Sequence, residues 1–394
     1  MVLRPVLLPV LRPALMPLFD RIRRSAAVFS PLSNFSSGQL GAWYDPSTFT
    51  GLYQDSAGTS PATAVGQPDG LMLDKRLGLV RGMELVSNGD FNTDTAGWTP
   101  VAGITQTWVA GEIKLTTNGS GYTSDSLAIQ LVSGKSYEIS ASIRPFTAAG
   151  SPTNLGRIQL QGALSGFLEP GGALKRIMTA SGSNLVLALG VASSGVLAES
   201  GGYCFFDNIS VKELPGNHIS QATASARPII NAAGGIQYLT FDGLDDGLST
   251  GPITLGSDMD CFVAIRRSTS SQMILLSATT GGGNYIGVIQ SGSSESTENG
   301  AGSPSYAVDG VLVNAGATSV TRGQLHTALP SNVWHVLEIR NINVLSWPSI
   351  SFGGYGGWAL NGDFGGIILC PAGDATTRQK NRQYLGNKVG LTLP

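Results

Sequence analysis

The densest group of acidic side chains lies in the stretch Phe-Asp-Gly-Leu-Asp-Asp at positions 241–246. Cleavage of a glycosidic bond needs two carboxylates that flank the bond, and a calcium ion needs several oxygen ligands. Asp242, Asp245 and Asp246 offer the residue types for either chemistry. Aspartate is also favoured where a strand runs into a turn, because its side chain bonds to the turn backbone. The position of the group favours a turn or calcium role over catalysis.

The chain has only three histidines, and none stands in a recognisable catalytic motif. His218, His326 and His335 lack a serine, cysteine or metal-spaced partner in the sequence, whereas nucleophilic catalysis and metal binding need such partners. The glycine-rich stretches 281–283 and 353–357 lack the strand–GxxxxGK–helix context of a phosphate-binding loop. We therefore predict that the protein is not an enzyme, and we name no catalytic residue.

Aromatic residues provide a second kind of candidate site, for binding without catalysis. Tyr355 and Trp358 lie in a glycine-flanked loop, where their rings could stack on a sugar. Aromatic faces supply contact area at a small cost in conformational entropy. Trp98, Trp108 and Tyr122 are similar candidates earlier in the chain. The alternative for all five is that they cover the edge of a core or contact a neighbouring subunit.

Composition indicates which kind of scaffold positions these residues. The 394 residues allow two or three domains, and they include 53 glycines but only 13% charged residues. Low charge with many glycine turns is typical of β-sandwiches in a larger assembly. The net charge of −2 argues against nucleic-acid binding. Three cysteines in separate apolar runs are expected to be buried thiols rather than zinc ligands or disulfides, as in a protein made in a reducing cytosol.

Residues 1–24 form an apolar stretch that is interrupted by four prolines and by arginines. A proline inside a helix costs about 3 kcal/mol, so we expect no membrane-spanning helix there. Arg12 divides the apolar run, which fits a cleaved signal peptide poorly. One alternative is a disordered tail. We favour an extended arm, residues 1–36 with a short helix near 19–27, because exposed apolar side chains are poorly solvated unless a partner protein covers them. The anchoring side chains would be Leu3, Val6, Leu7, Leu8, Leu11, Leu15, Met16 and Phe19.

Residues 79–213 contain strand-like runs separated by Gly, Ser and Asn turns, enough for one sandwich. The predicted strands include 107–116, 126–132, 136–143, 157–160 and 185–191. The domain opens with Asn-Gly-Asp-Phe at 88–91 followed by Gly97 and Trp98, and closes with Phe-Asp-Asn-Ile-Ser-Val at 206–211. These motifs resemble carbohydrate-binding-module jelly rolls with a galactose-binding-like fold.

That resemblance implies a structural calcium ion where the two ends of the jelly roll meet. Asp207 matches the closing acid of the family motif, whereas Asn92 stands where the family usually has a glutamate. Asp90 and Glu84 are near in sequence and complete the set of candidate ligands. Calcium takes six to eight hard oxygen ligands, so these four residues alone would not fill its coordination shell.

Residues 214–394 are predicted to form a second sandwich. The stretch 236–247 alternates apolar and polar residues and then reaches Asp-Gly twice, which predicts a strand followed by turns. Trp-His-Val-Leu-Glu-Ile-Arg at 334–340 alternates in the same way, and Asp374 or Thr376 can cap a helix over 374–388 that turns Tyr384 and Leu385 toward the sandwich. Residues 37–78 are expected to pack on this sandwich. The fold class is thus all-β: two β-sandwich jelly-roll domains, an N-terminal arm and a short C-terminal helix.

Motifs in residues 37–78 and 214–394 resemble laminin-G-like, concanavalin A-like domains of bacteriophage virion proteins. They are Gly-Ala-Trp-Tyr-Asp-Pro at 41–46, Gly-Gln-Pro-Asp-Gly-Leu-Met-Leu-Asp at 66–74, and the segment 216–228 with its closing Arg-Pro. The resemblance implies a virion structural protein, made in the bacterial cytoplasm, that the arm attaches to other virion proteins. Its sandwiches would contact host-surface glycans as a tail-fibre or baseplate component, and a homotrimer is expected by analogy. The alternatives are a capsid or tail decoration protein, or a glycan-degrading tail enzyme.

Overall fold

The computed structural model describes residues 29–36, 38–118, 124–145, 156–169, 174–191, 201–268, 272–278, 283–315, 319–353 and 358–394. It confirms the predicted all-β class and the helix near the C-terminus. The eight proposed anchoring side chains, with the predicted helix near 19–27, lie outside the described residues, as do Tyr122 and Tyr355. Among the described helices, none combines the length and apolar character needed to cross a bilayer.

One sandwich consists of two five-stranded antiparallel sheets that pack face to face. One sheet has the order β11-β8-β13-β6-β5, and the other has the order β10-β9-β12-β7-β4. Their strands are β4 (Thr99–Pro100), β5 (Ile104–Val109), β6 (Glu112–Thr117), β7 (Ser124–Gln130), β8 (Ser136–Pro145), β9 (Arg157–Gly162), β10 (Gly166–Leu168), β11 (Lys175–Thr179), β12 (Asn184–Gly190) and β13 (Tyr203–Glu213).

Alternation along the strands creates the core of this sandwich. In β6, Ile113 and Leu115 are buried while Glu112 and Lys114 face outward, because successive side chains point to opposite faces. The single strand predicted over 107–116 is wrong. Ala110 (φ 50°) and Gly111 (φ 89°) form a tight turn that divides it into the hairpin β5–β6.

The second sandwich combines an eight-stranded and a seven-stranded sheet. The first sheet contains β1 (Ala42–Tyr44), β15 (Ile229–Ala233), β16 (Ile236–Asp242), β18 (Met259–Arg267), β23 (Ser305–Val308), β24 (Val311–Leu312), β25 (His335–Ile342) and β27 (Asn361–Pro371). The other contains β2 (Leu52–Tyr53), β3 (Leu71–Met72), β14 (Ile219–Ser220), β17 (Leu248–Thr250), β20 (Leu276–Ser277), β21 (Tyr285–Ile286) and β26 (Ser351–Phe352). A short pair, β19 (Gln272–Met273) and β22 (Ile289–Gln290), lies apart from both.

Segments far apart in sequence complete the second sandwich. Strand β1 pairs with β27, and β3 pairs with β14, so residues 42–72 share sheets with the C-terminal part of the chain. Helix α3 (Ala375–Lys388) covers the face of the eight-stranded sheet that points away from the other sheet. Asp374 caps it by accepting from the Thr377 backbone N–H at 2.7 Å, and Leu385 is buried against the sheet, as predicted.

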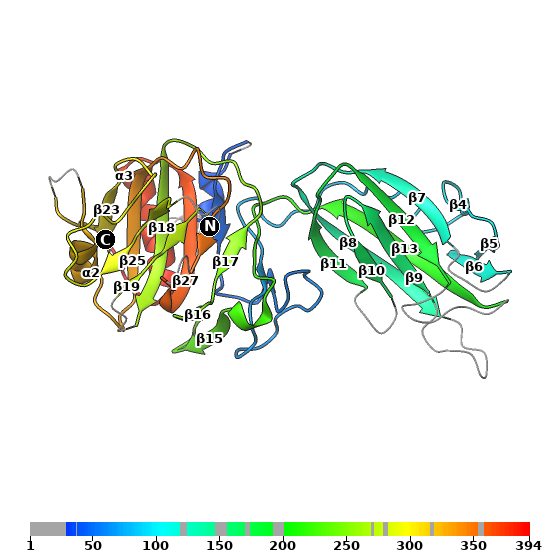
Figure 1. The fold of residues 1–394 in the computed structure, drawn as a ribbon, viewed down its shortest axis with the longest axis horizontal. Helices are drawn as coiled ribbons and strands as arrows, with labels where there is room; N and C mark the ends of the chain where they lie inside the picture. The colour runs from blue at the N-terminus through cyan, green and yellow to red at the C-terminus, as the bar shows by residue number, and fades with distance from the viewer. Residues whose placement is uncertain are drawn as a thin grey trace, which may run out of the picture.

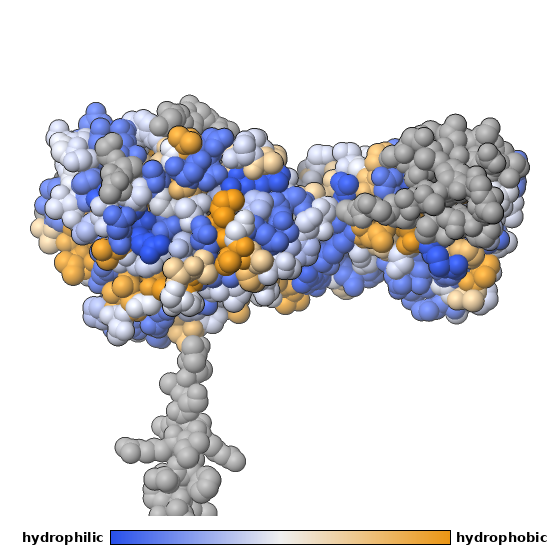
Figure 2. Space-filling view, turned by 90° about the horizontal axis from the view of Figure 1, so that it is seen from below, coloured by the Kyte–Doolittle hydropathy of each residue, from blue (hydrophilic) through white to orange (hydrophobic). Residues whose placement is uncertain are grey.

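The remaining helical elements are the 3-10 turns η1 (Pro31–Asn34) and η2 (Ala224–Ala226) and the short helix α2 (Arg322–Ala328), which the sequence patterns did not predict. The two sandwiches lie end to end along the long axis of the molecule (Figure 1). Figure 2 shows a narrower waist between them and apolar patches scattered among hydrophilic residues. The three cysteines are buried free thiols, as expected.

Candidate functional site

Helix α2 and the segment 290–295 border two hollows on the second sandwich. Thr321 and Gln324 form a capping box: the Gln324 backbone N–H donates to Thr321 Oγ1 at 3.2 Å, and the Thr321 backbone N–H donates to Gln324 Oε1 at 2.9 Å. This reciprocal cap starts a helix of only seven residues at a defined position. It thereby sets the direction of Arg322, the first residue of the helix.

Arg322 is 6% exposed, and its guanidinium is held on several sides. Its Nε donates to the carbonyl oxygen of Ser296 at 2.9 Å, and its Nη2 donates to the Tyr285 hydroxyl at 2.9 Å. Its Nη1 donates to Gln290 Oε1 at 3.3 Å and forms an ion pair with Glu295, whose side chain is 66% exposed. A planar guanidinium can satisfy these partners together because its donors form a rigid fork.

Trp358 lies against this fixed cation. The guanidinium carbon of Arg322 is 4.9 Å from the centre of the Trp358 ring, within the range of a cation–π interaction. Trp358 itself is half-buried. The two residues border an open hollow of about 640 Å³, whose other lining residues are Gln272, Gln290, Ser291, Gly292, Ser293, Ser294 and Glu295.

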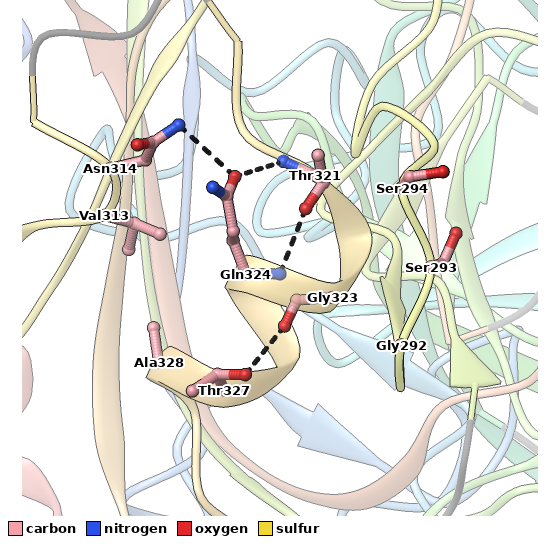
Figure 3. A pocket seen from close by; sticks show the side chains of 10 residues that line it. All are labelled: Gly292, Ser293, Ser294, Val313, Asn314, Thr321, Gly323, Gln324, Thr327 and Ala328. Atoms are coloured by element: carbon pink, nitrogen blue, oxygen red, sulfur yellow. Dashed lines mark hydrogen bonds between the residues drawn. The ribbon is translucent and has the colours of Figure 1, made fainter.

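A second hollow, of about 660 Å³, shares part of its lining with the first (Figure 3). Its lining is uncharged. Gln324 Oε1 accepts from Asn314 Nδ2 at 3.4 Å, and Thr327 Oγ1 donates to the Gly323 carbonyl at 2.9 Å. Gly292, Ser293 and Ser294 border both hollows. The remaining residues that line the second hollow are Val313, Thr321 and Ala328.

The chemistry of the two hollows suits a hydroxylated ligand. An aromatic ring, planar amide and guanidinium groups and serine hydroxyls offer apolar contact together with donors and acceptors. Of the two loop aromatics predicted from the sequence, Trp358 lies at this site. Arg322, Gln290 and Gln272 were not predicted, because they come from separate segments that meet only in the folded protein.

The predicted aromatics of the first sandwich have different surroundings. Trp98 is 4% exposed, packs against Phe91 and donates its indole N–H to the Asn88 carbonyl at 3.2 Å, so it presents no free ring face. Trp108 is 45% exposed on strand β5 and donates its indole N–H to the Phe91 carbonyl at 2.6 Å. Trp108 therefore stays a prediction for ligand contact, whereas Trp98 is a core residue.

Sequence reasoning missed an aromatic pair on the outer face of β13. The rings of Tyr203 and Phe205 lie 5.6 Å apart, edge to face. Lys114 Nζ lies 3.9 Å from the centre of the Tyr203 ring, and Arg144 Cζ lies 3.7 Å from that of Phe205. The signal was the alternation Tyr-Cys-Phe-Phe at 203–206, in which Cys204 faces the core. Because Phe205 is only 9% exposed, the pair is a weaker candidate for sugar stacking than the half-buried Trp358.

The predicted calcium ligands are not assembled around one point. Glu84 accepts from Ser210 Oγ at 2.6 Å and from the Val211 backbone N–H at 2.9 Å, so its carboxylate joins the opening segment to β13. The oxygens of Glu84, Asp90 and Asp207 do not all lie within reach of a single ion in the described part of the chain.

The other two acids of that set, Asp90 and Asp207, accept hydrogen bonds from residues close to them in sequence. Asn92 Nδ2 donates to Asp90 Oδ2 at 2.6 Å, and the Asn208 backbone N–H donates to Asp207 Oδ1 at 2.7 Å. Partial burial raises the pKa of Asp207, and the charges of Glu112 and Asp90 raise it further. These contacts describe a polar turn region rather than a formed ion cage.

The carboxylates of Asp242, Asp245 and Asp246 do come together, within 4.8 Å of one another. Asp246 Oδ2 accepts from the Asp242 backbone N–H at 2.9 Å, and Asp242 Oδ1 accepts from the Leu244 backbone N–H at 2.8 Å. Burial, followed by the charges of its two neighbours, raises the pKa of Asp246 to about 6. The hydrogen bonds correspond to the turn role considered for this group.

Comparisons with known proteins found no matching family model and no matching curated protein. Among solved structures, the N-terminal CBM22-1–CBM22-2 tandem domain of Paenibacillus barcinonensis Xyn10C is 12% identical, covering 74% of this chain and 98% of its own, with a TM-score of 0.29. The tandem CBM51 modules of the family 98 glycoside hydrolase Sp3GH98 from Streptococcus pneumoniae are 9% identical, covering 73% and 92%, with a TM-score of 0.20. The ANX1 ectodomain from Arabidopsis thaliana is 8% identical, covering 67% and 83%, with a TM-score of 0.19. At such low TM-scores and identities, we draw no functional inference from these similarities.

Proposed function

We propose that this protein is a non-enzymatic glycan-binding protein and that the hollow bordered by Trp358 and Arg322 is its glycan site. The observation that carries the proposal is the 4.9 Å stacking of a half-buried indole on a guanidinium that is itself held by backbone and side-chain oxygens. A ring fixed in this way loses little conformational freedom when a sugar packs on it. Gln272, Gln290 and Glu295 supply donors and acceptors for hydroxyl groups around the ring.

The adjoining uncharged hollow extends this site. Because residues 292–294 line both hollows, a linear glycan could place one sugar against Trp358 and the next units against Asn314 and Gln324. The ligand class is therefore an oligosaccharide or polysaccharide rather than a single sugar. Neutral units are favoured in the second hollow, because no charged side chain lines it among the described residues.

The biological setting we propose is a bacteriophage particle. The resemblance of residues 41–74 and 216–247 to phage virion proteins supports it, as does the pairing of β1 with β27 and of β3 with β14, which joins these distant segments into one sandwich. In this proposal residues 1–36 attach the protein, as a homotrimer, to other virion proteins. The sandwiches then project toward glycans on the host surface during adsorption.

The test is binding of the full chain to an array of bacterial capsular and lipopolysaccharide glycans, followed by calorimetry with the strongest hit. We expect saturable binding that falls at least tenfold in Trp358→Ala and is largely retained in Trp358→Phe, which keeps a ring face. No binding on the array and no heat at millimolar glycan would overturn glycan binding and favour a decoration protein that contacts only virion proteins. Release of reducing ends from the bound glycan would instead favour a tail enzyme.

A further inference from the structure

In the described part of the chain, two chain crossings and a direct contact join the two sandwiches. The crossings run side by side, with the Gly82 backbone N–H donating to the Glu213 carbonyl at 2.8 Å. The direct contact places strand β11 against the loop that follows β2. There the Ile177 backbone N–H donates to the Ala57 carbonyl at 2.7 Å, and a small apolar cluster contains Ile177 together with Leu71 and Leu214.

A cleft of about 520 Å³ lies beside this contact. Both sandwiches line it: strands β8 and β11 of the first, and strands β3, β14 and β17 with the loop after β2 of the second. It is therefore a cavity between two domains, a common place for small-molecule sites. Its lining residues are Ser56, Ala57, Leu71, Ser136, Ile177, Met178, Thr179, His218, Ser220, Gln221, Ala222, Ser249, Thr250 and Gly251.

The lining is rich in hydroxyl groups and carries no formal charge. Ser136 Oγ and Thr179 Oγ1 lie 3.0 Å apart on the side of the first sandwich. On the opposite side, Ser249 and Ser220 belong to the neighbouring strands β17 and β14. His218 is neutral there, because its Nδ1 accepts from the Asp74 backbone N–H at 3.0 Å and burial lowers its pKa.

Strand β11 adds backbone groups to these hydroxyls. Among the described strands it pairs with β8 alone, at the edge of its sheet. The Ile177 N–H points away from β8, toward Ala57, and backbone groups two residues along an antiparallel strand point the same way. The N–H and carbonyl of Thr179 therefore face the cleft side of the strand, where a ligand can pair with them.

We infer that this cleft is a second binding site, for a small uncharged polyhydroxylated ligand such as one neutral sugar unit. Apolar contact would come from Ile177 and Met178, and hydrogen bonds from Ser136, Thr179 and Ser220. A charged ligand is disfavoured because it would leave water without an opposite charge to pair with. Since both sandwiches line the cleft, a bound ligand also holds them in one relative orientation. This inference does not depend on the Trp358 site.

The test uses the full chain, with glucose, galactose, mannose and N-acetylglucosamine as probes, and follows binding by calorimetry and thermal unfolding. At least one probe should bind saturably and raise the unfolding temperature. Ser220→Tyr, which fills the cleft, should weaken that binding at least tenfold. Thr179→Val deletes a hydroxyl while keeping the volume of the side chain, so it tests the same site if the larger residue disturbs folding, and it should also weaken binding about tenfold.

Two controls separate this site from the others. Thr107→Tyr introduces a tyrosine, as Ser220→Tyr does, but on the exposed outer face of β5. It should leave the affinity for the single sugars unchanged. Trp358→Ala should also leave the affinity for single sugars unchanged while weakening binding of the longer glycan at least tenfold, so either site can fail alone. The inference is overturned if none of the four sugars binds, if both cleft variants bind normally, or if Trp358→Ala abolishes binding of the single sugars.

Discussion

The central carbon of the Arg322 guanidinium lies over the ring of Trp358, 4.9 Å from the ring centre. One residue starts a short helix and the other comes just before the C-terminal strand β27, so the stacking joins two distant segments of the second sandwich. The first prediction tests whether the guanidinium, and not merely its positive charge, supports the ring.

Arg322→Lys should lower both glycan affinity and stability. A lysine ammonium cannot bond to the Ser296 carbonyl and the Tyr285 hydroxyl while lying under the ring. We expect about a tenfold loss of affinity, measured by calorimetry. The free energy of unfolding in urea should fall by about 1–3 kcal/mol. Arg81→Lys, at a more exposed ion pair with Glu138, should change stability by less than about 1 kcal/mol. Unchanged glycan affinity in Arg322→Lys would show that Trp358 needs no guanidinium.

Asp69→Asn should flatten the dependence of stability on pH. Asp69 is fully buried, and its carboxylate oxygens have no hydrogen-bond partner among the described residues. Burial raises its pKa from 3.8 to about 8, outweighing a weak interaction with the Tyr53 backbone N–H. Its contribution to stability is therefore full below pH 3.8 and is lost as the pH rises toward 8.

The expected size of this effect is about 1.4 kcal/mol per pH unit between those limits. Urea unfolding of the wild type and Asp69→Asn from pH 4 to 9 measures it as a difference, which cancels the contributions of other carboxylates. The variant should become progressively more stable than the wild type as the pH rises, up to about pH 8. If the free energies of unfolding of the two proteins changed with pH in parallel, Asp69 would ionise normally in the folded protein.

Gly41→Ala should destabilise the second sandwich through strand β1. Gly41 has φ 134°, and a Cβ atom there would overlap the Leu369 carbonyl oxygen of the partner strand β27. We expect a loss of about 3 kcal/mol in the free energy of unfolding. Gly38 also has a positive φ, 83°, but a Cβ atom there meets nothing within 4 Å. Gly38→Ala therefore isolates backbone strain from the clash, and equal losses in the two variants would contradict the role of the β1–β27 contact.

Glu338→Ala should be among the most destabilising substitutions in the chain. The buried Glu338 carboxylate pairs with Arg382 Nη1 of helix α3 at 2.7 Å and with Arg340 Nη2 at 2.7 Å. Its removal leaves two arginines without their counter-charge, which costs about 3–5 kcal/mol. Glu112→Ala removes the partner of the exposed Arg144 and should cost less than about 1 kcal/mol. Similar losses would show that water screens Glu338 as it does a surface residue.

Local patterns determined the class of the fold and several of its elements. Alternation of apolar and polar residues predicted β16 and β25, because a strand with one buried face repeats every two residues. Asp374 and the residues after it predicted helix α3, since a capping aspartate acts on backbone groups within one turn. The turn at Ala110–Gly111 was missed because the alternation of apolar and polar residues continues across it. Gly111 was the local signal, since glycine readily adopts the positive φ that the turn requires.

The site depended on tertiary structure. Trp358 was named from its glycine-flanked loop alone, but its partners Arg322 and Gln290, and the cleft shared by Thr179 and Ser220, come from segments that meet only after the sheets pair. Short-range residue patterns carry no information about such contacts, because the choice of neighbouring strands depends on which apolar faces bury one another. The sequence therefore determined which segments become strands and which side chains face the cores. Packing of the sheets decided which polar and aromatic side chains lie together at a surface.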